Sequence, residues 1–233
     1  MYGEVFCRVY NELGWNYYPE AFAGQLLRWL DSVGAEVRTA LDLGCGTGVL
    51  CRILYENGIE AAGMDLSEGM ISIAREADGR IRYDVADMIT YCPGKEFDLV
   101  TCTGDALNHI PRLSDVETVL RNIYGYLTPG GYLVFDILNE KEVSDSEPFE
   151  LDFDEKTHVW FQMTRPDAQT VALKVRVWEA GELKCEETIS ETIHDPDYIC
   201  RMLRTIGFRN IRCTHSLSDT GNQATTWFVT AKK

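Results

Sequence analysis

A glycine-rich segment after a short apolar run carries the clearest chemical signal in this sequence. Residues 41–48 read Leu-Asp-Leu-Gly-Cys-Gly-Thr-Gly, between a predicted strand at 39–43 and a predicted helix at 49–55. Glycines permit a tight turn and let a ligand approach the backbone where a Cβ would collide. In a doubly wound sheet, the turn after the first strand is where a nucleotide-like ligand binds. A plain helix entry has the same composition, so the turn needs a second signal.

Two acidic residues supply that second signal. Asp65 ends the next predicted strand, twenty-one residues after Gly44, and its carboxylate can accept hydrogen bonds from both ribose hydroxyls of an adenosine. Asp87 follows the third predicted strand and can accept from an adenine amine, while Met88 can pack on the ring. Each also has a structural alternative, because Asp65 can cap the following helix and Asp87 can be an ordinary loop residue.

The elements that must position these residues alternate along the chain. Apolar runs typical of strands lie at 39–43, 59–64, 81–85, 97–102 and 132–138. Helical spacing of apolar residues occupies the N-terminal 36 residues and the ranges 49–55, 70–77, 116–127 and 195–206. Strand and helix that alternate in this way predict a parallel sheet covered by helices on both faces. Two further strands, at 208–213 and 225–231, are expected to close the sheet.

One segment departs from this rhythm. Residues 151–193 alternate apolar and polar side chains between turn signals, which predicts an antiparallel meander with one covered face. We therefore divide the chain into a main domain, residues 1–139 plus 194–233, and an antiparallel β insertion at 140–193. Four of its side chains are candidates for lining a substrate lid: Trp160, Phe161, Arg176 and Trp178.

Five short motifs in this order resemble the class I S-adenosylmethionine-dependent methyltransferases. They are the glycine-rich segment 41–48, Gly63-Met64-Asp65-Leu66-Ser67, Asp87, Phe97-Asp98-Leu99-Val100 and Leu127-Thr128-Pro129-Gly130-Gly131. The resemblance covers about residues 38–138 and implies a Rossmann-like seven-stranded sheet of order 3-2-1-4-5-7-6 whose last strand is antiparallel. It also implies S-adenosylmethionine as cofactor, S-adenosylhomocysteine as product, and a small-molecule acceptor with a nitrogen or oxygen nucleophile.

The expected cofactor-binding residues combine these motifs with the N-terminal aromatic residues, which in similar enzymes cover the cofactor. They are Tyr10, Tyr18, Asp42, Gly44, Cys45, Gly46, Gly48, Asp65, Leu66, Met70, Asp87, Met88, Cys102 and Thr103. The run Val9-Tyr10-Asn11-Glu12-Leu13 looks like the Val-Tyr-Asp-x-Leu start of many such enzymes, with Asn11 in place of the usual aspartate.

The substrate end is expected at the end of the fourth strand. Asp105 and His109 are the candidate catalytic residues there: Asp105 to orient a cationic substrate or a water, and His109 as a base or as a structural histidine. Methyl transfer from a sulfonium needs mainly a nucleophile held in line, so a general base is optional.

Two alternatives stay open. A nicotinamide-dependent oxidoreductase would carry G-x-G-x-x-G, whereas here Gly48 comes one residue early. The second alternative is a non-catalytic protein that binds an S-adenosyl ligand in the same site.

The composition of the chain limits the kinds of binding partner that we expect. With 22 Lys plus Arg against 37 Asp plus Glu, the net charge of −15 disfavours nucleic acid and anionic membranes. No apolar stretch of membrane-spanning length occurs and no residues have metal-ligand spacing, so we expect no membrane span and no metal. The eight cysteines form no C-x-x-C pair and the first residues lack a secretion signal, which favours a cytoplasmic protein. A monomer or a homodimer is expected.

Overall fold

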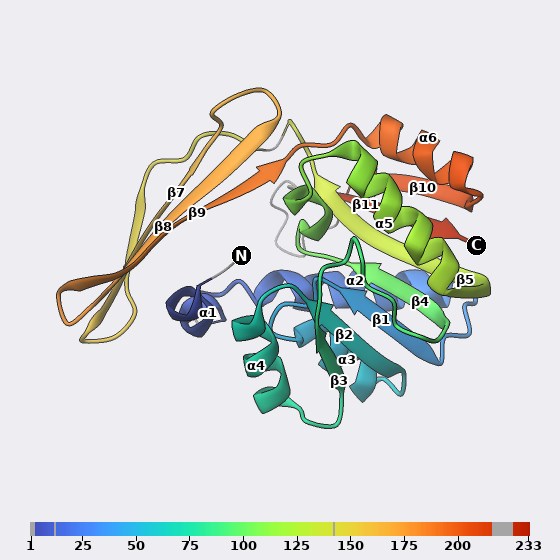
Figure 1. Ribbon diagram of the computed structural model, residues 1–233, viewed down its shortest axis with the longest axis horizontal. Helices are drawn as coiled ribbons and strands as arrows, with labels where there is room; N and C mark the ends of the chain where they lie inside the picture. The colour runs from blue at the N-terminus through green and yellow to red at the C-terminus, as the bar shows by residue number, and fades with distance from the viewer. Residues whose placement is uncertain (1–2, 12, 142, 216–225) are drawn as a thin grey trace.

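A seven-stranded mixed sheet organises the protein, and a separate four-stranded antiparallel sheet lies beside it (Figure 1). The computed structural model describes residues 3–11, 13–141, 143–215 and 226–233. The helices are α1 (Glu4–Tyr10), α2 (Tyr17–Ser32), α3 (Val49–Glu56), α4 (Glu68–Ala77), the 3-10 helix η1 (Ala106–His109), α5 (Leu113–Tyr126) and α6 (Pro196–Ile206). The strands of the main sheet are β1 (Thr39–Leu43), β2 (Glu60–Asp65), β3 (Arg82–Val85), β4 (Phe97–Cys102), β5 (Leu127–Leu138), β10 (Arg209–His215) and β11 (Thr226–Lys232).

The strand order of the main sheet is β10-β11-β5-β4-β1-β2-β3. Strands β1 to β5 are parallel, whereas β11 runs antiparallel to both β5 and β10. When the second sheet is left out of the count, this order is the predicted 3-2-1-4-5-7-6 with its reversed last strand. The predicted fold class is therefore confirmed.

Helices cover both faces of the main sheet because successive side chains of a buried strand point to opposite sides. In β4, Leu99 packs with the cluster formed by α2, α3 and α4, whereas Val100 packs with the cluster that contains α5 and α6. In β5, Val134 and Phe135 divide between the same two clusters. The near-continuous apolar runs of the sequence follow from this burial on two faces.

The second sheet forms from β6 (Phe149–Asp152), β7 (Thr157–Thr164), β8 (Thr170–Glu179) and β9 (Glu182–Thr192) in that order. Its apolar face is covered by α1, whose Phe6 and Val9 pack with Val159, Val175 and Val177. Figure 1 shows α1 between this sheet and α4. The N-terminal helix therefore connects the second sheet to α4 of the main sheet's helical layer.

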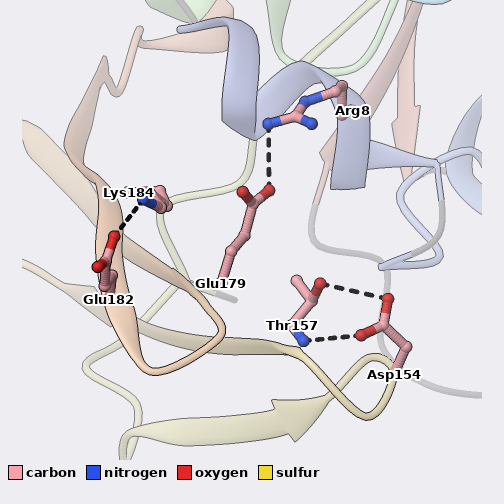
Figure 2. A network of polar contacts seen from close by, with 6 residues as sticks. All are labelled: Arg8, Asp154, Thr157, Glu179, Glu182 and Lys184. Carbon is pink, nitrogen blue, oxygen red and sulfur yellow. Dashed lines mark hydrogen bonds and ion pairs between the residues drawn. The ribbon is translucent and has the colours of Figure 1, made fainter.

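Polar contacts fix α1 on the second sheet. Figure 2 shows Arg8 of α1 reaching Glu179 at the end of β8, with 3.1 Å between Nη2 and Oε1. The backbone N–H of Gly3 donates to Glu187 Oε1 of β9 at 2.9 Å. These bonds orient α1 against β8 and β9, although the exposed ion pair by itself adds little stability.

Most predicted boundaries shift by a few residues, and the start of β5 shifts by more. The Thr-Pro-Gly-Gly segment at 128–131 reads as a turn before a strand at 132–138, yet β5 already begins at Leu127. Leu127 pairs with Phe97, and the register shifts before Tyr132 pairs with Leu99. A Cβ at Gly131 would lie 3.0 Å from the Asp98 carbonyl oxygen, so the glycine lets the two strands stay paired through this irregularity.

Gly48, the N-cap residue immediately before α3, allows a stability test. It has a φ of +75°, and an added Cβ would lie 2.5 Å from Tyr83 Oη and 3.0 Å from Ala74 Cβ. Gly58 has a φ of +83° but no atom within 4 Å of such a Cβ. Both alanine variants strain the backbone, but only Gly48→Ala also overpacks. We expect it to lower the free energy of unfolding in urea by about 1–3 kcal/mol more than Gly58→Ala does; equal losses would contradict this packing account.

Candidate functional site

A cavity of about 1230 Å³ lies at the ends of the parallel strands. The turn after β1, the end of β2, the loops after β3 and β4, the segment that joins α1 to α2, and strand β9 all contribute to its lining. The order of the sheet reverses between β1 and β4, and the connections from these two strands therefore leave in opposite directions and open a crevice. The fold thus places the glycine turn where a ligand can reach it.

The glycine turn and Asp65 are joined by a hydrogen bond. Gly46 N–H donates to Asp65 Oδ2 at 2.9 Å, and Ser67 N–H donates to Oδ1 at 2.8 Å. Burial raises the pKa of Asp65, although the hydrogen bonds from these backbone groups oppose the shift. At Gly46, with a φ of +52°, an added Cβ would meet no atom within 4 Å. This turn leaves open space beside an oriented carboxyl group.

Asp42 lies beneath the turn at the end of β1. Its side chain is buried and accepts from Thr101 Oγ1 at 2.7 Å, and burial raises its pKa to about 7. Asp87 accepts from Ile89 N–H at 2.9 Å and so orients its own loop. In this respect Asp87 acts as the ordinary loop residue considered above. Both residues line the cavity, as does Met88.

Most of the predicted cofactor-binding residues meet in this cavity. Its lining includes Tyr10, Tyr18, Asp42, Gly44, Cys45, Gly46, Asp65, Leu66, Met70, Asp87, Met88 and Thr103. Two predicted residues, both in the described part of the chain, do not line it. Gly48 packs against Tyr83, and Cys102 is fully buried in the core beneath α5.

The N-terminal segment covers the cavity through two specific contacts. Thr47 Oγ1 of the glycine turn donates to Asn11 Oδ1 at 2.7 Å. The Tyr18 hydroxyl donates to Asp136 Oδ2 and lies 2.9 Å from Thr226 Oγ1. Tyr10 packs edge-on against Trp15 at 5.3 Å between ring centroids. Asn11, at the position where the resemblance expects aspartate, therefore ties the cover to the turn.

At the other end of the cavity, Asp105 and Glu191 belong to the lining, whereas the fully buried Asp136 accepts from the Asp105 N–H and does not line the cavity itself. These three residues are here called the carboxyl cluster. Burial raises the pKa of Asp105 well above its usual value, and the charges of Asp136 and Glu191 raise it further. Burial likewise raises the pKa of Asp136 to about 7 and, with the charge of Asp136, that of Glu191 to about 7. The three groups are thus close enough to disfavour one another's ionised forms.

Strained backbone sets this geometry. Gly104 and Asp105 both have left-handed conformations, with φ of +68° and +58°, and the Asp105 N–H donates to Asp136 Oδ1 at 3.4 Å. Aspartate tolerates this region better than most residues, and such strain gathers at functional sites. His109 follows in η1, with 3.7 Å between its Nε2 and Glu191 Oε1, and burial lowers its pKa. Both predicted catalytic residues therefore line the same end of the cavity.

Comparison with known proteins gives the family. The model of the methyltransferase domain matches residues 15–212. The putative methyltransferase YqeM of Bacillus subtilis (strain 168) is 30% identical over 227 residues, which cover 92% of this chain and 90% of that protein. The chain belongs to the methyltransferase-domain family. This membership confirms the predicted enzyme class, a methyltransferase.

Solved structures share the fold of this methyltransferase. An S-adenosylmethionine-dependent methyltransferase from Clostridium acetobutylicum ATCC 824 superposes with a TM-score of 0.80 at 21% identity, and 97% of each chain is covered. CalS10, an aminopentose methyltransferase from Micromonospora echinaspora, also gives 0.80, at 19% identity, over 100% of this chain and 98% of that one. Both matches extend across the second sheet, so the fold includes the insertion.

Sequence reasoning missed two members of the carboxyl cluster. Asp136 interrupts the apolar run of β5, and a charged residue in a buried strand is rare without a partner; that signal was available in the sequence. Glu191 stands among other acidic residues of β9, and only its burial distinguishes it. The four candidate lid residues, Trp160, Phe161, Arg176 and Trp178, all lie in the described part of the chain and outside the cavity lining. Leu173 of β8 and residues 186–191 of β9 line the cavity instead.

Within the described residues, no helix is long and apolar enough to cross a membrane. Across the same residues, no group of three or more His, Cys, Asp and Glu side chains is arranged to hold a metal ion.

The raised pKa values predict pH-dependent stability of the ligand-free methyltransferase. A carboxyl group with a higher pKa in the folded chain binds more protons there, so the free energy of unfolding falls as pH rises from the unfolded pKa near 4 to the folded value of about 7 for Asp136 and Glu191. We expect lower stability at about pH 7.5 than at about pH 5.5, and Glu191→Gln to reduce this difference by on the order of 1 kcal/mol in urea unfolding.

Glu182→Gln is the control for this measurement. Glu182 lies on the same strand, and its hydrogen bond with Lys184 lowers its pKa. Its contribution to the pH dependence of the free energy of unfolding therefore lies at a lower pH than this window. An undiminished pH dependence in Glu191→Gln would contradict the prediction.

Proposed function

We propose that this methyltransferase transfers the methyl group of S-adenosylmethionine to a nitrogen or oxygen of a small molecule held in the same cavity. The observation that carries this proposal is the continuity of the cavity from the glycine turn and Asp65 to the carboxyl cluster and β9. Pockets for one drug-sized ligand measure roughly 300–1,000 Å³. A cavity of about 1230 Å³ has room for the cofactor and a second small ligand.

The glycine-turn end fits the cofactor. The Asp65 carboxyl is held by two backbone N–H groups and faces the open space at Gly46, which suits hydrogen bonds from ribose hydroxyls. Asp87 and Met88 suit the adenine. Acidic side chains along the lining also suit a sulfonium cation. When bound, S-adenosylmethionine supplies an activated methyl group and its sulfur keeps the bonding electron pair.

The protein's own part in the reaction is to position the acceptor and exclude water. A nucleophile held in line with the methyl carbon gains much of its rate from orientation alone. Tyr10, Trp15 and Tyr18 close one side of the cavity, and β9 closes another. We assign the insertion at 140–193 the role of a substrate cover, because Leu173 and residues 186–191 face the cavity.

This enclosure favours a small acceptor over a macromolecule, and the net charge of −15 disfavours nucleic acid. The aminopentose methyltransferase with the same fold is, by its name, an enzyme of a small acceptor. The eight cysteines are all free thiols, which supports the cytoplasmic location we propose.

Asp65 provides the test of cofactor binding. We expect Asp65→Ala to weaken S-adenosylhomocysteine binding by about 1.5–3 kcal/mol, because hydrogen bonds to a charged group are lost. Calorimetry measures this loss, and NAD serves as a second ligand that we expect not to bind. Asp31→Ala, an exposed change at the end of α2, is the control. Unchanged affinity in folded Asp65→Ala would remove Asp65 from this role.

Turnover tests the function itself. The purified protein, given S-adenosylmethionine and a panel of small amines, alcohols and thiols, is expected to release S-adenosylhomocysteine with members of the amine or alcohol groups. Mass spectrometry then finds the methylated product. Binding of the cofactor without release from any panel member would favour the non-catalytic alternative.

A further inference from the structure

The lining of the cavity has a strong charge imbalance. Eight of its described residues are acidic: Asp42, Asp65, Asp87, Asp105, Asp115, Glu186, Glu187 and Glu191. Arg112 is the single arginine in that lining, which contains no lysine, and its Nε already lies 2.8 Å from Asp115 Oδ2. A low-dielectric cavity lined by one sign of charge concentrates ligands of the opposite sign.

The acidic residues are not equivalent, because most have a partner. Asp65 accepts from two backbone N–H groups, Asp42 accepts from Thr101, and Glu187 accepts from Gly3 N–H. These carboxyl groups shape the cavity walls. Their hydrogen bonds also explain why they are stable there without a cation.

The carboxyl cluster differs in one respect. Asp136 is held by the Tyr18 hydroxyl and the Asp105 N–H, and Glu191 lies beside His109. Asp105 Oδ1 is buried and has no hydrogen-bond partner within the described residues, and Asp105 lines the cavity. An unsatisfied buried acceptor costs free energy unless a ligand supplies the donor.

From this arrangement we infer that the methyl acceptor is an amine that enters as its ammonium ion, is bound by Asp105 and Glu191, and gives a proton to Asp105. The inference rests on the proposed methyl transfer and adds its acceptor class. An ammonium ion supplies N–H donors for Asp105 Oδ1, which the cluster lacks. It also supplies a positive charge that relieves the repulsion between the carboxylates. An alcohol supplies only a donor, and a carboxylate ligand adds repulsion.

The proton step follows from the same residues. An ammonium nitrogen has no lone pair and cannot attack the methyl carbon. One N–H bond breaks, its electron pair stays on nitrogen, and the proton moves to the Asp105 carboxylate, which becomes neutral. The amine nitrogen then forms its bond to the methyl carbon as the sulfur–carbon bond breaks toward sulfur. The product leaves as a methylated ammonium ion, and Asp105 returns its proton to solvent.

Burial suits Asp105 to this step. A carboxylate whose pKa is raised is a stronger base than an exposed one, so its pKa approaches that of the proton donor. Asp136 acts as a positioning residue, because its carboxyl group holds the Asp105 N–H and with it the left-handed turn.

Binding of matched probes tests the inference. The protein saturated with S-adenosylhomocysteine is titrated with cyclohexylamine, cyclohexanol and cyclohexanecarboxylate, which share a ring and differ in the polar group. We expect cyclohexylamine to bind at least about tenfold more tightly than the other two. Equal binding of the three probes, or no binding of the amine to the saturated protein, would overturn the inference.

Variants locate the amine. Asp105→Asn and Glu191→Gln remove one charge each with little change in shape, and we expect each to weaken cyclohexylamine binding by about tenfold. Glu182→Gln, on β9 outside the cavity, should leave it within about twofold. Glu191→Gln is the independent check if Asp105→Asn does not fold, because Glu191 lies outside the strained turn.

The same titrations separate the possible failures. The cluster would instead serve the cofactor's sulfonium if the two variants weakened S-adenosylmethionine binding but left cyclohexylamine binding unchanged, and that result overturns the inference. If the unaltered protein did not bind S-adenosylhomocysteine, the proposed function would be contradicted. If it bound S-adenosylhomocysteine but showed no preference for the amine probe, only the inferred acceptor class would be contradicted.

Discussion

The reversal of strand order between β1 and β4 is the constraint on which the rest of the site depends. Parallel strands end at one edge, and connections that leave in opposite directions cannot fill the space between them. The glycine turn, Asp65 and the loop after β4 reach that space because their strands end there. The main sheet therefore places the glycine turn, Asp65 and Asp105 around one cavity.

Closing this crevice requires segments that are distant in sequence. The second sheet lies about one hundred residues after the glycine turn, yet β9 and α1 cover the cavity together because α1 buries its apolar face on β7 and β8. Asn11 and Tyr18 then tie the N-terminal segment to the glycine turn and to β5. The cover is thus held to both the glycine turn and the carboxyl cluster.

The burial of several carboxyl groups close together has an energetic cost. Burying carboxyl groups beside one another disfavours their charges, and the raised pKa values of Asp136 and Glu191 express that cost. Active sites concentrate such perturbed groups because catalysis needs acids and bases with pKa values near the working pH. The same carboxyl cluster that weakens the ligand-free protein is thereby suited to a cationic ligand.

The amino-acid sequence by itself determined the main sheet, the glycine turn with its neighbouring acidic residues, and the family. Those features rest on local patterns: apolar runs buried on two faces, glycines with left-handed backbone, and acids that directly end strands such as Asp65. Tertiary structure alone decided which side chains meet at the carboxyl cluster. Trp160, Phe161, Arg176 and Trp178 were the expected lid residues, whereas packing of α1 on the sheet left Leu173 and β9 facing the cavity. Asp105, Asp136 and Glu191 come from three separate elements, and no spacing in the chain records their proximity, because only the folded sheet and its cover bring those elements together.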